Sequence, residues 1–187
     1  MNIKNVYLAL LCSSIMGASA ARAVEIKGSE EIPSGSLLIW NGESDSKDMN
    51  KFRHGELNTT EAFKGNGCFA AERDKNKYPE LYVPLTNING YDEIWFHVKA
   101  SKDNETCHLK LISFPNRGNE VKIDHYINGN KITKNYKLVK IPIKDLSEGT
   151  KYDGTSIRII AFGGVKPWPP EAHMLYIDEI YAVRTLK

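Results

Sequence analysis

Two adjacent carboxylates, Asp178 and Glu179, stand in the middle of an apolar stretch at residues 174–183. The stretch is rich in β-forming residues and predicts a strand that is buried on both faces, or nearly so. A carboxylate inside such a strand is strongly destabilising unless it is paired, hydrogen-bonded or bound to a metal ion. We therefore expect Asp178 to bind a cation or to accept hydrogen bonds from backbone amides where the strand meets a loop.

The N-terminus has the pattern of a secretory signal peptide. Lys4 supplies a positive charge, and residues 6–16 are apolar but too short to span a bilayer. Residues 18–20 and 21–23 each have the small-x-small pattern of a signal-peptidase site. We expect residues 1–23 to be a signal peptide and residues 24–35 a lead-in segment, so that the protein is secreted or periplasmic. The alternative is an uncleaved anchor. No second hydrophobic stretch is long enough to span a membrane, so we expect no span in the mature chain.

Export changes the interpretation of the cysteines. Of the three in the chain, Cys12 lies in the signal segment, which leaves Cys68 and Cys107. An even pair in an oxidising compartment predicts a disulfide bond. The alternative is two buried free thiols. Two cysteines without histidines at ligand spacing do not predict a zinc site.

The sequence offers little support for catalysis or for nucleic-acid binding. No Gly-x-Ser-x-Gly nucleophile motif is present. The net charge of +2 argues against the clustered basic surface that nucleic acids require. None of the five histidines lies in a recognisable catalytic motif; they are His54, His97, His108, His125 and His173.

Short strands separated by turn signals make up most of the chain, and no convincing amphipathic helix interrupts them. This pattern predicts an all-β protein, with residues 36–187 forming one antiparallel β-sandwich domain of two sheets. The expected strands are residues 36–40, 68–72, 80–85, 92–100, 108–114, 120–127, 136–143, 156–162 and 174–183.

Five weak motifs in a fixed order resemble the jelly-roll carbohydrate-binding modules, which have a galactose-binding-like β-sandwich fold. They include a Gly-Tyr-x-x-aliphatic-x-Phe-x-Val-Lys-Ala strand and a closing aliphatic-Asp-acidic-Ile strand. The resemblance covers roughly residues 36–184, and its motifs are residues 39–43, 63–69, 88–100, 136–146 and 176–180. It implies a jelly roll that binds a polysaccharide or another glycan.

The resemblance also implies a structural Ca²⁺ near the chain ends. Carried over to this sequence, its ligands are the carboxylates of Glu43 and Asp178 and the backbone carbonyls of Lys64 and Asn66. Calcium prefers several oxygen ligands, including carbonyls, so the set is chemically reasonable. In the alternative, Asp178 accepts hydrogen bonds from backbone amides or from Lys or Arg side chains, and Glu43 is solvated.

Sugar sites combine flat aromatic rings with a few polar side chains. Alternation places Ile94, Phe96 and Val98 on one face of their strand, and Trp95 and His97 on the other. The alternatives are that Trp95 belongs to the core and that Trp168 packs its own proline-rich loop. The predicted glycan contacts are Trp95, His97, Tyr126, Arg158 and Trp168.

These observations predict an exported, non-catalytic carbohydrate-binding protein that recognises a glycan through aromatic side chains. The second hypothesis is a protein-interaction module on the same fold. The third is a small glycoside hydrolase, because the two carboxylates of such an enzyme need not be close in sequence.

Overall fold

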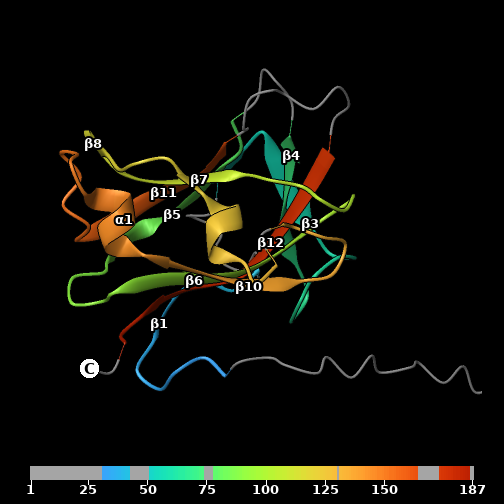
Figure 1. Cartoon of the computed structure of the whole chain (residues 1–187), viewed down its shortest axis with the longest axis horizontal. Helices are drawn as coiled ribbons and strands as arrows, with labels where there is room; N and C mark the ends of the chain where they lie inside the picture. The colour runs from blue at the N-terminus through green and yellow to red at the C-terminus, as the bar shows by residue number, and fades with distance from the viewer. Residues whose placement is uncertain (1–30, 43–50, 74–77, 130, 164–172, 186–187) are drawn as a thin grey trace, which may run out of the picture.

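The computed structural model describes residues 31–42, 51–73, 78–129, 131–163 and 173–185. These residues form two antiparallel sheets that pack as the two layers of a β-sandwich (Figure 1). The predicted all-β fold with two antiparallel sheets is therefore confirmed. The predicted signal peptide, residues 1–23, lies outside the described residues. No helix within the described ranges is long and apolar enough to cross a membrane.

Sheet A is built around the strand that contains Asp178, β12. Its strands, in spatial order, are β10 (Lys137–Pro142), β6 (Glu93–Ala100), β12 (His173–Val183), β4 (Cys68–Arg73) and β3 (Gly55–Asn58), with β1 (Leu37–Trp40) also paired to β12. β12 is the longest described strand, and it pairs with β1, β4 and β6. Its long apolar sequence agrees with this central position, because a strand with neighbours on both sides has few exposed groups.

Sheet B forms the second layer and is centred on β11. Its strands, in spatial order, are β2 (Lys51–Arg53), β5 (Glu80–Asn87), β11 (Ser156–Gly163), β7 (His108–Ser113) and β8 (Asn116–Arg117), with β9 (Val121–Lys122) also paired to β7. Two short helices complete the described fold: the 3-10 helix η1 (Ile123–Tyr126) and the α-helix α1 (Ile143–Ser147). Figure 1 shows α1 at one end of the sandwich.

Alternate residues of the strands fill the space between the sheets. Ile94, Phe96 and Val98 of β6 belong to this core and are fully buried. In sheet B, Ile160 and Phe162 of β11 lie in the same cluster. Because side chains alternate across a strand, the residues between them point to the outer faces of the sandwich, where a ligand has access.

One predicted strand, residues 120–127, is wrong in most of its length. Only Val121–Lys122 forms a strand, and η1 follows at once. Ile123 and Ile127 are both buried, and their spacing of four residues suits a helical turn better than a strand. The short strands β2, β3 and β8 were not predicted, because two to four mostly polar residues carry no clear alternation.

Candidate functional site

The outer face of sheet A holds two of the predicted glycan contacts, Trp95 and His97. Both side chains lie outside the core cluster, on the face that alternation predicts. Trp95 is nevertheless only 7% exposed. Its ring Nε1 donates a 2.6 Å hydrogen bond to Glu93, and Lys140 Nζ lies 4.1 Å from a Trp95 ring centroid. The indole is thus already packed against its own strand neighbours.

The connection between β3 and β4, residues 59–67, covers His97. The ring of Phe63 stacks on the His97 ring with centroids 3.7 Å apart. Tyr136 donates a 2.6 Å hydrogen bond to the carbonyl of Glu61, whose side chain forms an ion pair with Lys99. Burial, and secondarily the nearby Lys64 charge, lowers the pKa of His97 to about 4. This part of the sheet A face is closed by the protein's own residues.

Asp178 lies at an irregularity in β12 and is completely buried. Its Oδ2 accepts hydrogen bonds from the backbone N–H groups of Phe63 and Lys64, at 2.9 and 3.1 Å. Its Oδ1 accepts a 2.8 Å bond from the N–H of Glu179, which has a φ of 52°. Burial nevertheless raises the pKa of Asp178 to about 6, against the effect of these three bonds. The amide donors explain how the strand accommodates this carboxylate.

These contacts fit a calcium ion poorly. Both oxygens of Asp178 face N–H donors, and the ammonium of Lys64 lies 3.8 Å from the neighbouring Glu179 carboxylate. A cation in the same place would have to displace the amides and meet the lysine charge. Asn66 is exposed, and Glu43 lies outside the described residues. Among the described residues, no group of three or more His, Cys, Asp or Glu side chains is arranged to hold a metal ion.

The predicted disulfide between Cys68 and Cys107 is wrong, because both cysteines are buried free thiols. Cys107 belongs to the core cluster between the sheets, whereas the Cys68 side chain lies outside that cluster. Burial raises the pKa of the Cys68 thiol to about 11. A hydrogen bond with Tyr136 acts against this rise, and the Asp178 charge adds to it. The two thiols are therefore separated by sheet A. The alternative interpretation, two buried thiols, holds.

The remaining predicted glycan contacts do not join Trp95 and His97. Tyr126 lies in η1 and donates a 2.8 Å hydrogen bond to Asp145 of α1. Arg158 belongs to sheet B, where its guanidinium donates to the carbonyl of Val83 at 3.3 Å. Trp168 lies outside the described residues. The described members of the predicted set thus occupy three separate places.

The outer face of sheet B presents a different set of side chains in two cross-strand rows. The first row joins Tyr82, Ile159, Ile112 and Arg117, in that order, from β5 to β8. The second row joins Arg53, Glu80, Ala161 and Lys110, from β2 to β7. The first row is mainly apolar, and the second places charged side chains on both sides of a small alanine.

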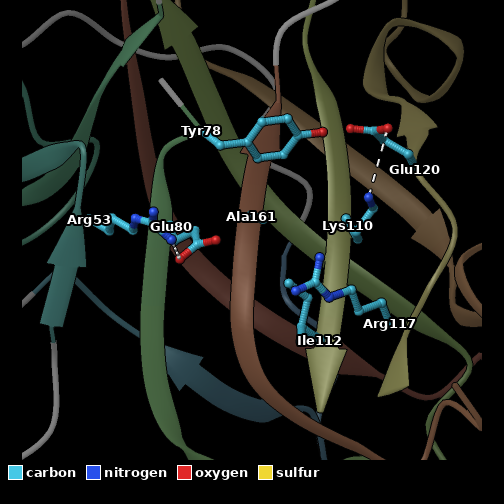
Figure 2. A pocket seen from close by; sticks show the side chains of 8 residues that line it. All are labelled: Arg53, Tyr78, Glu80, Lys110, Ile112, Arg117, Glu120 and Ala161. Atoms are coloured by element: carbon cyan, nitrogen blue, oxygen red, sulfur yellow. Dashed lines mark ion pairs between the residues drawn. The ribbon is translucent and has the colours of Figure 1, made fainter. Parts of the chain in front are cut away.

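This arrangement leaves a hollow of about 380 Å³ on the sheet, which we call the sheet B groove. In Figure 2, Ala161 lies at its centre, with Arg53 and Glu80 on one side and Lys110 and Glu120 on the other. Each side holds an ion pair, at 3.6 Å for Arg53–Glu80 and 3.8 Å for Lys110–Glu120. The lining residues are Arg53, Tyr78, Glu80, Lys110, Ile112, Arg117, Glu120 and Ala161.

The hollow follows from a decrease in side-chain size along β11. Ile159 and Ala161 lie on the groove side, in a small cluster with Ile112. Gly163 comes next, and a Cβ atom added there would collide with the Tyr78 hydroxyl and approach Glu120 Oε1. The glycine therefore allows the Tyr78 ring to lie over the end of the groove (Figure 2).

The groove is polar but partly desolvated. Burial, followed by the nearby Arg117 charge, lowers the pKa of Lys110, and burial raises the pKa of Glu120. Tyr82 donates a 2.8 Å hydrogen bond to Glu80, and this bond raises the pKa of the Tyr82 hydroxyl. Donors and acceptors thus stand beside apolar side chains, the combination that a sugar ring requires.

Sequence reasoning missed the residues of this groove. Arg53, Arg117 and Tyr78 belong to no motif in the sequence. One signal was present: in β7, Lys110 and Ile112 alternate with the core residues Leu109 and Leu111, so they share the outer face. The pairing with β11 and β8, which completes the groove, does not follow from the sequence.

A second hollow, of about 290 Å³, lies at the β3 and β4 side of sheet A. Its lining contains no Phe, Trp or Tyr side chain, unlike the sheet B groove. The residues are His54, Gly55, Glu56, Ala70, Glu72 and Met174.

Comparison with solved structures identifies the fold. No protein-family model matches the chain, and no curated protein matches it. The family 30 carbohydrate-binding module of a cellulosomal cellulase of Clostridium thermocellum superimposes with a TM-score of 0.53 at 12% identity, over 81% of this chain and 94% of that one. The family 11 module from Clostridium thermocellum, in complex with a β-1,3-1,4-mixed-linked tetrasaccharide, superimposes with a TM-score of 0.53 at 10% identity, over 84% of this chain and 99% of that one.

An enzyme is also among the similar structures. The β-1,2-glucanase from Parabacteroides distasonis gives a TM-score of 0.57 at 11% identity, over 83% of this chain but only 26% of that enzyme. The similarity thus concerns one part of the enzyme. At these identities the comparisons establish the architecture, and the chain has the jelly-roll β-sandwich fold of carbohydrate-binding modules.

Proposed function

We propose that the protein is an exported, non-catalytic glycan-binding protein and that the glycan lies in the sheet B groove. The observation that carries this proposal is the groove itself: a hollow of about 380 Å³ with Tyr78 at one end and two ion pairs beside a small apolar floor. A sugar ring presents apolar C–H faces and many hydroxyls, and the groove offers a partner for each.

The contacts divide by chemistry. Tyr78 provides the surface for a sugar C–H face, and the nearly buried Ile112 and Ala161 form the apolar floor beneath it. The paired side chains of Glu80 and Lys110 offer an acceptor and a donor to hydroxyl groups, at opposite sides of the floor (Figure 2). Charge-assisted hydrogen bonds are stronger than neutral ones, which compensates for the desolvation of the sugar hydroxyls.

The fold supports the proposal by analogy only. One solved module with this architecture is in complex with a mixed-linked tetrasaccharide, and the chain covers nearly the whole of that module. The same likeness supports export and the absence of turnover, since carbohydrate-binding modules act by binding. Trp95, His97, Tyr126, Arg158 and Trp168 remain predicted contacts.

The test is a glycan array with the purified protein, followed by calorimetric titration of the best ligand. We expect Tyr78→Ala to weaken binding about tenfold, because the sugar loses its aromatic contact. Tyr176→Ala is the matched control: it removes the same ring from the outer face of sheet A, where Tyr176 lies beside Lys99. We expect this variant to bind like the wild type.

Other outcomes would point elsewhere. Loss of binding in Trp95→Ala or Trp168→Ala, with Tyr78→Ala unaffected, would move the site to the predicted residues. A blank array would contradict glycan binding and favour the protein-interaction hypothesis. Release of new reducing ends from a bound oligosaccharide, abolished by Glu80→Gln or Glu120→Gln, would show a hydrolase that uses the two groove carboxylates.

A further inference from the structure

The groove contains more positive than negative charge. Its lining includes the cations Arg53, Lys110 and Arg117 but only the carboxylates Glu80 and Glu120, a formal excess of one positive charge. Arg53 and Lys110 each have a carboxylate partner. Within the described part of the chain, no carboxylate lies within 4 Å of the Arg117 guanidinium.

Arg117 and Lys110 lie side by side on the outer face of sheet B. Arg117 in β8 is directly opposite Ile112 in β7, and Lys110 is two residues from Ile112 on the same strand. The two cations are therefore diagonal neighbours, a relation that long side chains can bridge. Figure 2 shows both on the β7 side of the groove, and the nearby Arg117 charge contributes to the lowered pKa of Lys110.

Two adjacent cations repel each other, and only Lys110 has a carboxylate partner among the described residues. That partner is Glu120, which lies 3.8 Å from Lys110 and whose pKa is raised by burial. An anion placed between Lys110 and Arg117 would relieve the repulsion between them. The planar guanidinium suits a carboxylate particularly well, because it can donate two parallel hydrogen bonds.

We infer that the sheet B groove selects glycans that carry an anionic group, and that the carboxylate of a uronic acid residue lies between Lys110 and Arg117. This inference rests on the proposed function, because it names the class of sugar that the same groove takes. Sulfate on a sugar is an oxyanion of related chemistry, so the experiment must separate the two.

The experiment compares matched oligosaccharides that differ only at C6 of the sugar. Calorimetry with the full protein measures binding of cellotetraose, of the equivalent β-1,4-linked tetramer of glucuronic acid, and of 6-O-sulfated cellotetraose. Galactose/galacturonate and mannose/mannuronate pairs extend the panel to other sugars and linkages. We expect the uronate member to bind at least about tenfold more tightly than its neutral counterpart in one pair, as a new charged hydrogen bond requires.

Variants test whether this selectivity depends on Arg117. Arg117→Gln is expected to abolish the preference for the uronate, so that the uronate and neutral members of a pair bind with equal affinity. Lys151→Gln removes the same charge from an exposed residue outside the groove, and it should change neither the preference for the uronate nor the affinity for the neutral oligosaccharide. Raising NaCl from about 20 to about 500 mM should weaken uronate binding and spare neutral binding, because salt screens exposed charges. Arg117 is exposed, so its substitution should leave the unfolding midpoint unchanged.

Each result decides the inference. Equal or tighter binding of neutral members would overturn anionic selection while leaving glycan binding in place. Unchanged selectivity in Arg117→Gln would overturn the assigned location. Binding of no member would overturn both the inference and the proposed function. If the sulfated oligosaccharide binds more tightly than the uronate, with the same dependence on Arg117, the result would support selection of anionic glycans and would replace the uronate by a sulfated sugar.

Discussion

The two outer faces of the sandwich are built from strands of the same kind, yet the sheet A face is closed around Trp95 and His97, whereas the sheet B face is open around Ala161. On sheet A, Phe63 stacks on His97, and Trp95 is held by Glu93 and Lys140. On sheet B, the corresponding centre is Ala161, and a hollow of about 380 Å³ lies over it. The connection at residues 59–67 covers His97, and Lys140 of the neighbouring strand β10 covers Trp95, whereas the small side chain of Ala161 leaves space above sheet B.

This difference separates aromatic content from binding capacity. The sheet A face has the larger share of aromatic rings, but they contact one another and neighbouring charges, so they stabilise the fold. The sheet B face has fewer rings, but its side chains become smaller along β11 and leave space above them. We therefore expect substitutions on the outer face of sheet A (face A) to change the free energy of unfolding, and substitutions on the outer face of sheet B (face B) to change glycan affinity.

Asp178→Ala should have the largest effect on stability. It removes the acceptor of three backbone N–H groups, and buried donors without partners cost about 1–3 kcal/mol each. We expect the free energy of unfolding, measured in urea, to fall by about 3 kcal/mol or more. Asp153→Ala removes an exposed carboxylate that accepts the Thr155 amide, and it should leave the free energy of unfolding close to that of the wild type. A loss this small for Asp178→Ala, or an altered glycan affinity, would break the comparison.

Trp95→Ala should also act on stability and not on binding. The indole is 7% exposed and makes contacts with Glu93 and Lys140. Truncation of a buried tryptophan costs about 3–5 kcal/mol in cores, and we expect about 2–3 kcal/mol on this outer face. Glycan affinity, measured by calorimetry, should stay within twofold of the wild type. A tenfold loss of affinity would instead confirm Trp95 as a glycan contact and make face A the binding face.

The fold class could be predicted from the sequence because it depends on local patterns, namely the alternation of side chains along each strand. Ile94, Phe96 and Val98 alternate with Trp95 and His97, and this alternation sets which side chains enter the core. The anomaly of Asp178 was also visible, since a carboxylate in an apolar strand needs partners. Its partners, the amides of residues 63, 64 and 179, were included only as one of two alternatives.

The candidate groove could not be predicted because it depends on which strands become neighbours. Lys110, Ala161 and Glu80 are distant in sequence and meet only through the pairing of β7, β11 and β5. The disulfide prediction failed for a related reason: counting cysteines ignores the side of the sheet on which each thiol lies. Which strands pair, and on which side of a sheet a given side chain lies, depend on the tertiary structure, and a single sequence specifies them weakly.

The pH dependence of stability should sharpen the comparison through His97. Its folded pKa, about 4, lies below the ordinary value of 6.5, so the stability that its neutral ring contributes is present above pH 6.5 and is lost as the pH falls toward 4. We expect the wild type to lose about 2 kcal/mol relative to His97→Gln between pH 7 and pH 4.5. Unfolding in urea at both pH values gives this difference. His125→Gln, at an exposed histidine, should show no such change; a pH-independent difference for His97→Gln would mean that its ring can be protonated without cost.

Addition of calcium should have the smallest effect on stability. The experiment tests whether the region around Asp178 is closed to a metal ion. Binding through Glu43, Asp178 and the carbonyls of Lys64 and Asn66 stays a prediction. An ion bound at 100 times its dissociation constant would stabilise the protein by about 2.7 kcal/mol and raise the unfolding midpoint by several degrees. Because the Asp178 oxygens already accept three amide hydrogen bonds, we expect calcium and chelator to give midpoints within about one degree of each other. A larger rise, lost in Asp178→Asn, would show that the carboxylate exchanges its amide partners for a metal ion, and that the closed face opens to admit it.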